Sequence, residues 1–239
     1  LMEDKIQQFK QLVNKCDNIV FFGGAGVSTE SGIPDFRSKD GLYNQQYKYP
    51  PETILSHTFF MNKTEEFFKF YKLKMNSLKY QPNITHIKLS ELEARGKLKA
   101  VITQNIDGLH QKAGSKVVYE LHGSVLQNYC MNCHKFYDAE YVFNSNGIPR
   151  CSCGGIIKPD VVLYEEGLDE ETIENSTDAI QKADLLIVAG TSLTVQPASG
   201  LINFFRGRNL VLINRDSTPY DNKANLVIND SLGKVFSNL

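Results

Sequence analysis

The sequence predicts an α/β protein with a doubly wound, mostly parallel, Rossmann-like sheet and a smaller subdomain that combines a zinc ribbon with helices. Two observations predict the sheet. Short apolar runs alternate with helical segments along the chain, and small or polar residues follow directly where several of these runs end. A third observation predicts the ribbon, because two close pairs of cysteines stand in the second half of the chain.

Length and composition set the limits for this fold. The chain has 239 residues, of which 41% are hydrophobic and 22% charged, as is ordinary for a soluble globular protein. The net charge of −1 argues against a broad surface for nucleic acid or an anionic membrane. No apolar run approaches the ~20 residues of a membrane span, and the polar start of the chain lacks the features of a signal peptide. We therefore expect a cytoplasmic monomer without nucleic-acid or membrane partners.

The elements of the large part follow in chain order. Ile6, Phe9, Val13 and Cys16 recur at helical spacing and predict an amphipathic helix over residues 3–16, with Cys16 as a core residue. Strands are expected at 18–22, 99–103, 117–121, 184–189, 209–213 and 226–228, and helices at 86–96, 169–182, about 197–206 and the C-terminal end. We therefore expect a single domain, 1–239, whose large part consists of about residues 2–36, 82–124 and 159–239.

Two insertions are expected to build the small part. Residues 51–80 carry aromatic side chains between lysines and glutamates and predict two short helices, so that about 37–81 forms a helical subdomain. The second insertion, about 125–158, contains the paired cysteines. Residues 29–50 show little periodicity, and a loop of this length is usually functional, often as a lid.

The four cysteines predict one structural zinc ion. Cys130-x-x-Cys133 and Cys151-x-Cys153 are separated by seventeen residues, so two tight turns offer four thiolates. The second pair has one intervening residue where zinc ribbons usually have two, and Gly154 allows the tight backbone that such a turn needs. A closed set of four thiolates leaves no position for water, so the metal would be structural. The alternative is four free cysteines in a loop region.

The glycine-rich turn after the first expected strand predicts a phosphate site. Backbone N–H groups without neighbouring side chains can approach an anion closely, and the polar residues that follow stand where a helix would begin. Gly24-x-Gly26 has the spacing of a dinucleotide fingerprint, although Thr29 replaces the third glycine. The alternative is a tight turn without a ligand.

Polar clusters follow the ends of five expected strands. They are Gly24–Ser28, Gln104–Asp107, His122, Gly190–Ser192 and Asn214–Asp216. In open α/β sheets, ligands bind at the carboxyl edge where the strand order reverses. The coincidence of five clusters at this edge predicts a bound nucleotide.

Together these motifs resemble those of the sirtuins, which are NAD-dependent protein lysine deacylases. The resemblance covers nearly the whole chain and rests on Gly24-Ala25-Gly26-x-Ser28, Gly32-Ile33-Pro34-Asp35-Phe36-Arg37, Thr103-Gln104-Asn105-Ile106-Asp107, His122-Gly123, the four cysteines and Gly190-Thr191-Ser192. It implies a minimal catalytic core of bacterial type that uses NAD as a co-substrate and acyl-lysine proteins or peptides as substrates.

The resemblance also implies roles for individual residues. His122 would be the general base for a ribose hydroxyl, which suits an imidazole because its pKa lies near the working pH. Asn105 would orient the ribose hydroxyls or a water molecule, and Asp107 would hydrogen-bond the nicotinamide carboxamide. The implied NAD contacts are Gly24, Ala25, Gly26, Ser28, Thr29, Asp35, Phe36, Arg37, Gln104, Asn105, Ile106, Asp107, His122, Gly190, Thr191, Ser192, Asn214, Arg215 and Asp230.

Two further stretches are expected to contact the substrate. Val161, Val162 and Leu163 resemble the segment that pairs with the substrate backbone, although they also fit a buried strand. Tyr71 and Lys74 stand where some sirtuins that remove acidic acyl groups have Tyr-x-x-Arg, but lysine cannot form the planar fork of arginine, and a solvated helix face is the alternative. Deacetylation is therefore favoured. Desuccinylation, mono-ADP-ribosyl transfer and a non-catalytic NAD or ADP-ribose sensor remain alternatives.

Overall fold

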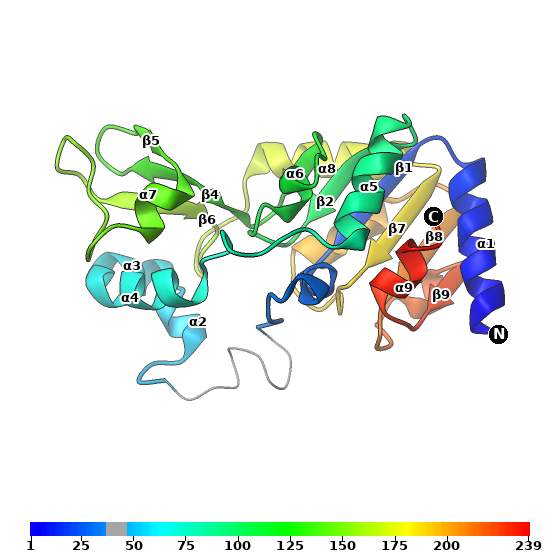
Figure 1. Ribbon diagram of the computed structural model, residues 1–239, viewed down its shortest axis with the longest axis horizontal. Helices are drawn as coiled ribbons and strands as arrows, with labels where there is room; N and C mark the ends of the chain where they lie inside the picture. Colours follow the sequence, from blue (N-terminus) through cyan, green and yellow to red (C-terminus); the bar gives the residue numbers. More distant parts are fainter. Residues whose placement is uncertain (37–46) are drawn as a thin grey trace.

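The computed structural model describes residues 1–36 and 47–239. Two sheets organise the chain: a six-stranded sheet in the order β3-β2-β1-β7-β8-β9 and a three-stranded sheet in the order β5-β4-β6. Figure 1 shows the large sheet and its helices at one end of the molecule and the small sheet at the other. Arg37 and part of the expected 29–50 loop lie outside the described residues.

The large sheet is parallel and doubly wound, as the sequence predicts. Its strands are β1 (Ile19–Gly23), β2 (Leu98–Thr103), β3 (Val118–Glu120), β7 (Leu185–Ala189), β8 (Asn209–Ile213) and β9 (Leu226–Ile228). Every neighbouring pair is parallel. The chain runs outward from β1 through β2 to β3, returns to place β7 on the other side of β1, and then runs outward through β8 to β9. The strand order thus reverses between β1 and β7, and this switch point is where such sheets bind ligands.

Helices cover both faces of this sheet because the central strands are apolar on both sides. Ile19 and Phe21 face one core and Val20 and Phe22 the other, as the two-residue period of a strand requires. The first core is closed by α1 (Met2–Lys15), α5 (Ile84–Ala94) and α9 (Leu232–Phe236), and the second by α8 (Glu170–Lys182) and the 3₁₀ segment η4 (Ala198–Phe204).

The small part combines three helices with the antiparallel sheet. The helices are α2 (Pro51–Ile54), α3 (His57–Asn62) and α4 (Thr64–Lys74), and the sheet consists of β4 (Gly123–Cys130), β5 (Phe136–Tyr137) and β6 (Ile157–Val161), with α7 (Ala139–Phe143) beside it. The expectation of two helices in 51–80 is wrong, because the Ser56 hydroxyl accepts the Phe59 N–H and starts a separate helix. The remaining short elements are α6 (Leu109–Lys112) and η5 (Asp221–Lys223).

The chain after β1 differs from the expected strand-to-helix turn. Instead of an α-helix it forms two 3₁₀ turns, η1 (Ala25–Val27) and η2 (Thr29–Ser31), and Gly32 in the left-handed region ends the second. The expected helix near 197–206 is likewise the 3₁₀ segment η4. The glycine-rich loop therefore offers the backbone groups of tight turns and not the N-terminus of a long helix. Among the helices of residues 1–36 and 47–239, none combines the length and the apolar character needed to cross a membrane.

Candidate functional site

The glycine-rich loop after β1 meets the loop that contains Gly190, after β7, at the switch point between these strands. The Gly26 N–H donates to the Gly190 carbonyl oxygen at 2.8 Å. A Cβ atom on Gly26 would lie 2.7 Å from the Gly190 Cα, so the two backbones are in direct contact. Gly190 also has a φ of +65°, which disfavours other residues. The sequence predicts a phosphate site at these glycines. The structure adds a second reason for glycine there, because the backbones of the two loops touch and leave no space for a side chain.

The loop after β2 is tied to both glycine loops through side chains. Asn105 Nδ2 donates to the Gly24 carbonyl at 2.9 Å. The Thr191 hydroxyl donates to Gln104 Oε1, also at 2.9 Å. The structure therefore brings together the polar clusters that follow β1, β2 and β7, as expected for a shared site at the carboxyl edge of the sheet.

Asp107 is the charged group at the centre of this network. Its Oδ2 accepts the Ser28 hydroxyl at 2.6 Å and its Oδ1 accepts the Leu109 N–H at 2.9 Å. Burial raises the pKa of the Asp107 carboxyl, while these two hydrogen bonds act in the opposite direction. Asp107 is thus a desolvated acceptor whose orientation is fixed by two donors, which suits recognition of an amide N–H.

His122 stands at the junction of the two sheets, two residues after the end of β3 and directly before β4. Its Nδ1 lies 2.9 Å from the carbonyl oxygen of Gln104. A carbonyl can only accept a hydrogen bond, so Nδ1 carries the proton of the neutral ring and Nε2 is the basic atom. The His122 carbonyl in turn accepts the Val162 N–H at 2.9 Å. The ring is therefore held in the tautomer that a general base requires.

Most of the other expected nucleotide contacts follow strands that end at the same edge. Thr29 donates to the Gly26 carbonyl, and exposed Ser192 shares a hydrogen bond with Thr194. Beyond β8 and β9, the Asn214 side chain donates to the Asp216 carbonyl and Asp230 pairs with Lys234 at 2.9 Å. The side chains of Ala25, Asp35, Arg215 and Asp230 are partly or fully exposed, while Phe36 and Ile106 pack against the core of the small part.

The expected role of Tyr71 as a substrate contact is corrected by its burial. Its side chain is 1% exposed and stacks between Phe67 and Phe143, with ring centroids 5.5 and 5.3 Å away. Its buried hydroxyl has no hydrogen-bond partner within the described ranges. Lys74 Nζ lies 5.8 Å from the centre of the Tyr47 ring. The two residues therefore do not form a pair that presents a phenol and a cation to a substrate.

The segment Val161–Leu163 is mostly core. The side chains of Val161 and Leu163 are 7% and 4% exposed, and only Val162 is half-buried. Their N–H groups are also engaged: Val162 donates to His122, and Leu163 donates to Glu166 Oε1 at 3.0 Å. A peptide that pairs with this segment must therefore donate its own N–H groups to carbonyl oxygens of the segment.

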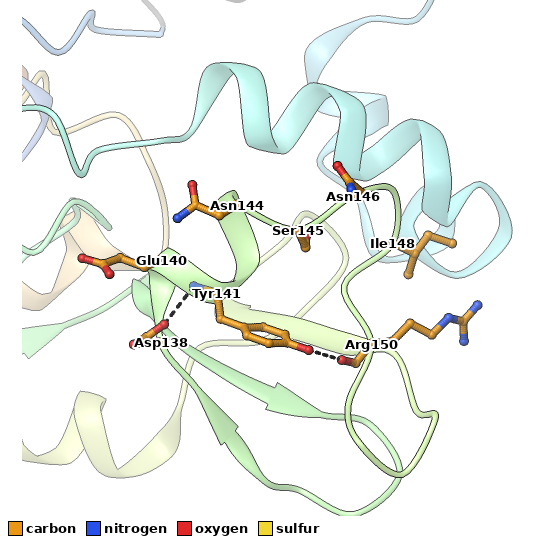
Figure 2. Close-up of a pocket in the computed structure, with 8 residues that line it drawn as sticks. All are labelled: Asp138, Glu140, Tyr141, Asn144, Ser145, Asn146, Ile148 and Arg150. Carbon is orange, nitrogen blue, oxygen red and sulfur yellow. Dashed lines mark hydrogen bonds between the residues drawn. The ribbon is translucent and has the colours of Figure 1, made fainter.

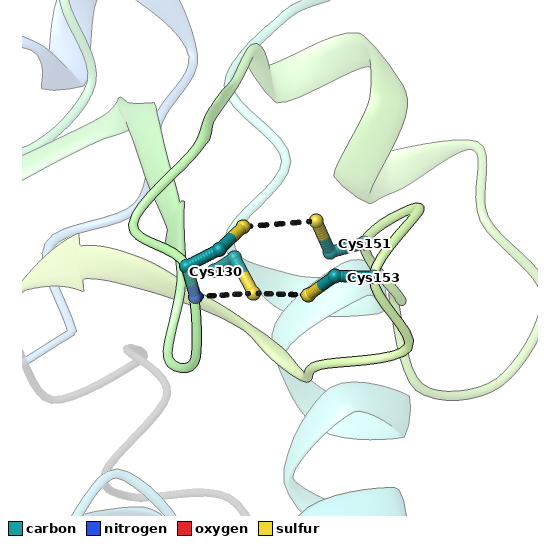
Figure 3. A group of neighbouring side chains, drawn as sticks. Cys130, Cys151 and Cys153 are labelled. Carbon is teal, nitrogen blue, oxygen red and sulfur yellow. Dashed lines mark hydrogen bonds between the residues drawn. The ribbon is translucent and has the colours of Figure 1, made fainter.

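The four cysteines converge on one point in the small part. Their sulfur atoms all lie within 4.8 Å of one another, and the Cys130–Cys153 and Cys133–Cys151 pairs are each 3.5 Å apart. Figure 3 shows the sulfurs of Cys130, Cys151 and Cys153 turned toward one another. Tetrahedral zinc with Zn–S bonds of about 2.3 Å requires S–S distances of about 3.8 Å, so the cluster fits one ion.

The surroundings of the sulfurs also fit thiolate ligands. The Asn132 N–H donates to Cys130 Sγ at 3.3 Å, and the Tyr137 hydroxyl donates to Cys151 Sγ at 3.0 Å. Hydrogen bonds lower the pKa of the Cys151 thiol to about 5, and the largest effect comes from the hydrogen bond with the Cys153 backbone. A Cβ atom on Gly155 would lie 2.5 Å from Cys130 Sγ, so only glycine allows this turn.

A second concave surface lies on the small part, away from these residues. It is an open pocket of about 640 Å³ lined by Asp138, Glu140, Tyr141, Asn144, Ser145, Asn146, Ile148 and Arg150. Figure 2 shows the Tyr141 ring across it, with its hydroxyl donating to the Arg150 carbonyl at 2.7 Å. None of the residues expected at the nucleotide site lines this pocket. It is therefore separate from the site at the sheet edge.

Sequence reasoning gave no role to two residues that the structure places beside the site. His86 Nε2 lies 3.5 Å from Ser28 Oγ, and the Glu120 carboxyl is buried two residues before His122. A signal for His86 was present, because it is the third residue of a helix that begins after Asn83, the spacing of a capping box. Glu120 ends a short apolar strand, and nothing in the local pattern distinguishes it.

Comparisons with known proteins agree with this geometry. The Sir2 family model matches residues 24–197. The chain is 61% identical over 238 residues to an NAD-dependent protein deacetylase of Clostridium perfringens (strain 13 / Type A), with 98% of each chain covered. It is 51% identical over 233 residues to an NAD-dependent protein deacetylase of Cutibacterium acnes (strain DSM 16379 / KPA171202), covering 97% of this chain and 96% of that one.

Solved structures share the fold of this chain over nearly its whole length. The structure described as "Sir2-p53 peptide-NAD+" has a TM-score of 0.85 at 38% identity and covers 98% of this chain and 96% of its own. The structure described as "Sir2 bound to acetylated peptide" has a TM-score of 0.85 at 36% identity, with the same coverage. The resemblance to the sirtuins is confirmed by these matches, and the chain belongs to the Sir2 family.

Proposed function

We propose that this protein is an NAD-dependent protein lysine deacetylase that transfers the acetyl group to ADP-ribose and releases nicotinamide. One observation carries the proposal. The Asp107 carboxylate, oriented by Ser28, and the His122 imidazole, held with Nε2 as its basic atom, lie on loops joined by hydrogen bonds at one edge of the sheet. The names of the relatives, which are NAD-dependent protein deacetylases, support the same activity.

The site residues fit NAD as the co-substrate. The glycine loops provide close backbone approach for the pyrophosphate, Asp107 an acceptor for the carboxamide, and Asn105 and Gln104 amides for the ribose. The remaining residues expected at the sheet edge are proposed contacts of the same molecule, with Arg37 among them although it lies outside the described residues. When bound, NAD supplies an electrophilic ribose carbon that the acyl oxygen of the substrate can attack.

The residues of the chain hold and move one proton. His122 Nε2 is placed to accept the proton of a ribose hydroxyl, which would allow that oxygen to attack the acyl carbon. The imidazolium that forms keeps its Nδ1–H on the Gln104 carbonyl, which stabilises the positive charge. Asp107 stays an acceptor throughout because Ser28 and Leu109 both donate to it. The cysteine cluster fits a structural zinc ion, which would hold β4 and thereby the backbone next to His122.

The choice of acetyl over acidic acyl groups rests on the small part. Tyr71 is buried, and the neighbouring Lys72 donates to the carbonyl oxygens of Ser145 and Gly147. These positions give no support to the alternative of a desuccinylase, and Val162 is the remaining partly exposed side chain of the proposed peptide segment. That the protein acts as a monomer in the cytoplasm stays a prediction from the sequence.

The test follows acetyl-, succinyl- and longer-acyl-lysine peptides by mass spectrometry in the presence of NAD. We expect loss of the acetyl group with an equal amount of O-acetyl-ADP-ribose, and slower or no loss of succinyl. His122→Asn keeps a donor for the Gln104 carbonyl but removes the base, so kcat should fall at least ~100-fold while NAD still binds. Peptide or protein that gains ADP-ribose without deacylation would favour the transferase instead, and NAD binding without nicotinamide release would favour a sensor.

A further inference from the structure

His86 is a fully buried histidine immediately behind the proposed nicotinamide contact. Its side chain is 0% exposed on α5, and its Nδ1 accepts the backbone N–H of Asn83 at 3.1 Å. This bond is half of the capping box that begins the helix. Because Nδ1 must offer a lone pair to an N–H, the proton of the neutral ring is on Nε2. The helix cap thus fixes the tautomer.

The protonated nitrogen of His86 faces the Ser28 hydroxyl. The Nε2–Oγ distance is 3.5 Å, a long contact, and the Asn105 amide nitrogen lies 3.4 Å from the same oxygen. Two N–H donors therefore aim at Ser28 Oγ, which leaves its own O–H to point away from both. That O–H donates to Asp107 Oδ2 at 2.6 Å. The order of donation runs from Asn83 through His86 and Ser28 to Asp107.

The surroundings of His86 keep this order in place. The ring of His110 packs edge-on against the His86 ring, with centroids 4.8 Å apart, and limits its rotation. His110 is 1% exposed, and neither of its ring nitrogens has a hydrogen-bond partner within residues 1–36 and 47–239. Burial lowers the pKa of His86 to about 4 and that of His110 to about 3. Both rings are therefore neutral near pH 7.

We propose that His86 is a positioning residue: its Nε2–H directs the Ser28 hydroxyl onto Asp107 and so aims the carboxylate at the nicotinamide carboxamide. This rests on the proposed function, in which Asp107 contacts the nicotinamide. His86 itself touches neither NAD nor the peptide in this proposal. Its chemistry is that of a buried, neutral donor whose direction is set by a helix cap.

The kinetic test compares two substitutions of similar size. A glutamine at the third helical position can reach back to the cap and can also donate to Ser28, so His86→Gln should retain function. His86→Leu fills the space but can do neither. We expect His86→Leu to lower kcat/KM for NAD about 10-fold and to weaken nicotinamide inhibition by a similar factor, as one lost hydrogen bond of ~1.4 kcal/mol would. Binding of acetylated peptide in the absence of NAD should be unchanged.

Two controls separate positioning from a loss of helix stability. Ile87→Gly weakens the same helix at an exposed position by ~1 kcal/mol without touching Ser28, and it should leave nicotinamide inhibition unchanged. In a Ser28→Ala background, His86→Leu should have no further effect, because the path through the hydroxyl is already absent. Additive effects, failure of His86→Gln to rescue, or an equal effect of Ile87→Gly would each overturn the proposal.

A spectroscopic test does not depend on turnover. Long-range ¹H–¹⁵N correlation spectra of the wild-type protein, with His86 assigned by the signals lost in His86→Gln, should show the Nε2–H tautomer near pH 7. The Nδ1–H tautomer or a charged ring would refute the inference even if the enzyme is an active deacetylase. Conversely, a wild-type protein that shows the Nε2–H tautomer but does not consume NAD would refute the proposed function and leave the geometric part of the inference standing.

Discussion

Glu120 is a buried carboxyl group at the end of β3, two residues before His122. Hydrogen bonds from the side chains of Gln111 and Ser124 reach it, but its Oε2 atom is buried without a partner in the part of the chain that the structure describes. Burial is the main cause that raises the pKa of Glu120 to about 7, with the nearby charges of Asp107 and Asp160 adding to it. The residue therefore changes charge in the range where the proposed enzyme works.

The pKa of Glu120 predicts how stability depends on pH. The pKa is raised above its unfolded value of 4.5, so the folded state holds this proton more tightly. Stability is then greatest at low pH and falls as the pH rises from about 4.5 to about 7, by on the order of 3 kcal/mol for this group. Urea unfolding should show a smaller loss of stability between pH 5 and pH 8 for Glu120→Gln than for wild type.

The matched control for this prediction is Glu174→Gln, at an exposed position on α8. It should keep the wild-type difference between pH 5 and pH 8. If Glu120→Gln and Glu174→Gln lose equal stability over this range, the buried carboxyl is not the source of the pH dependence.

At the scale of elements, the contact between two glycine loops holds the switch point together. A Cβ atom on Gly190 would lie 2.6 Å from the Val27 nitrogen, so the substitution forces the loops apart in addition to straining its own backbone. Gly147 has nearly the same φ, +64° against +65°, but a Cβ atom there meets nothing within 4 Å. Comparing alanine at these two positions therefore separates the effect of backbone strain from the effect of steric crowding.

We predict different outcomes for alanine at these two positions. Both substitutions carry a left-handed strain of ~1–2 kcal/mol, and Gly147→Ala should cost that much stability with an unchanged KM for NAD. Gly190→Ala should also raise the KM for NAD at least 10-fold, because the loop that follows β1 must move. Thermal unfolding and steady-state kinetics on both variants test this. A wild-type KM in Gly190→Ala would mean that the close approach of the loops does not shape the nucleotide site.

An element or a contact can be predicted from the sequence where the residues that determine it are close together in the chain. The strands of the large sheet were predictable because runs such as Leu185–Ala189 are buried on both faces and therefore apolar throughout. The 3₁₀ turns after β1 were not, because the loop that they pack against follows a strand more than 160 residues later. Tyr71 was misassigned since the ring that covers it, Phe143, comes from the other insertion. The contact of His86 with Ser28 spans 58 positions and leaves no local pattern.

At the scale of the whole molecule, the hydrophobic cores of the large and the small part are separate, and β4 is one of the segments that link them. The cores on the two faces of the large sheet contain no cysteine of the metal cluster, whereas Cys130 and Cys151 belong to the core of the small part. β4 connects them, since it begins beside His122 and ends at Cys130. In Figure 1, β4 and β6 lie in the small sheet and extend from it toward the large part.

Removal of the metal should therefore unfold the small part first. We expect the wild-type protein to hold one zinc per chain, and Cys153→Ser or chelation to give two thermal transitions in place of one, with the far-UV signal of the large sheet retained after the first. Structural zinc contributes on the order of 10 kcal/mol to folding in small domains, and deacetylation should be lost with it because β4 carries the backbone next to His122.

Cys16→Ala is the matched control for metal removal. Cys16 is 5% exposed and lies in a core of the large sheet, so this variant should lose some stability but keep one zinc per chain and a single transition. A single, unshifted transition in Cys153→Ser would show that the cluster does not stabilise the small part.

The placement of the insertions has an evolutionary consequence. The six strands of the large sheet bond only to one another, and the inserted segments depart after β1 and after β3 and return before β2 and before β7. Residues can thus be added, removed or replaced in the helices and the ribbon without changing the register of any strand at the nucleotide edge. Descendants of one ancestral gene can therefore keep the strand register of the nucleotide edge while the lengths and sequences of the two insertions diverge.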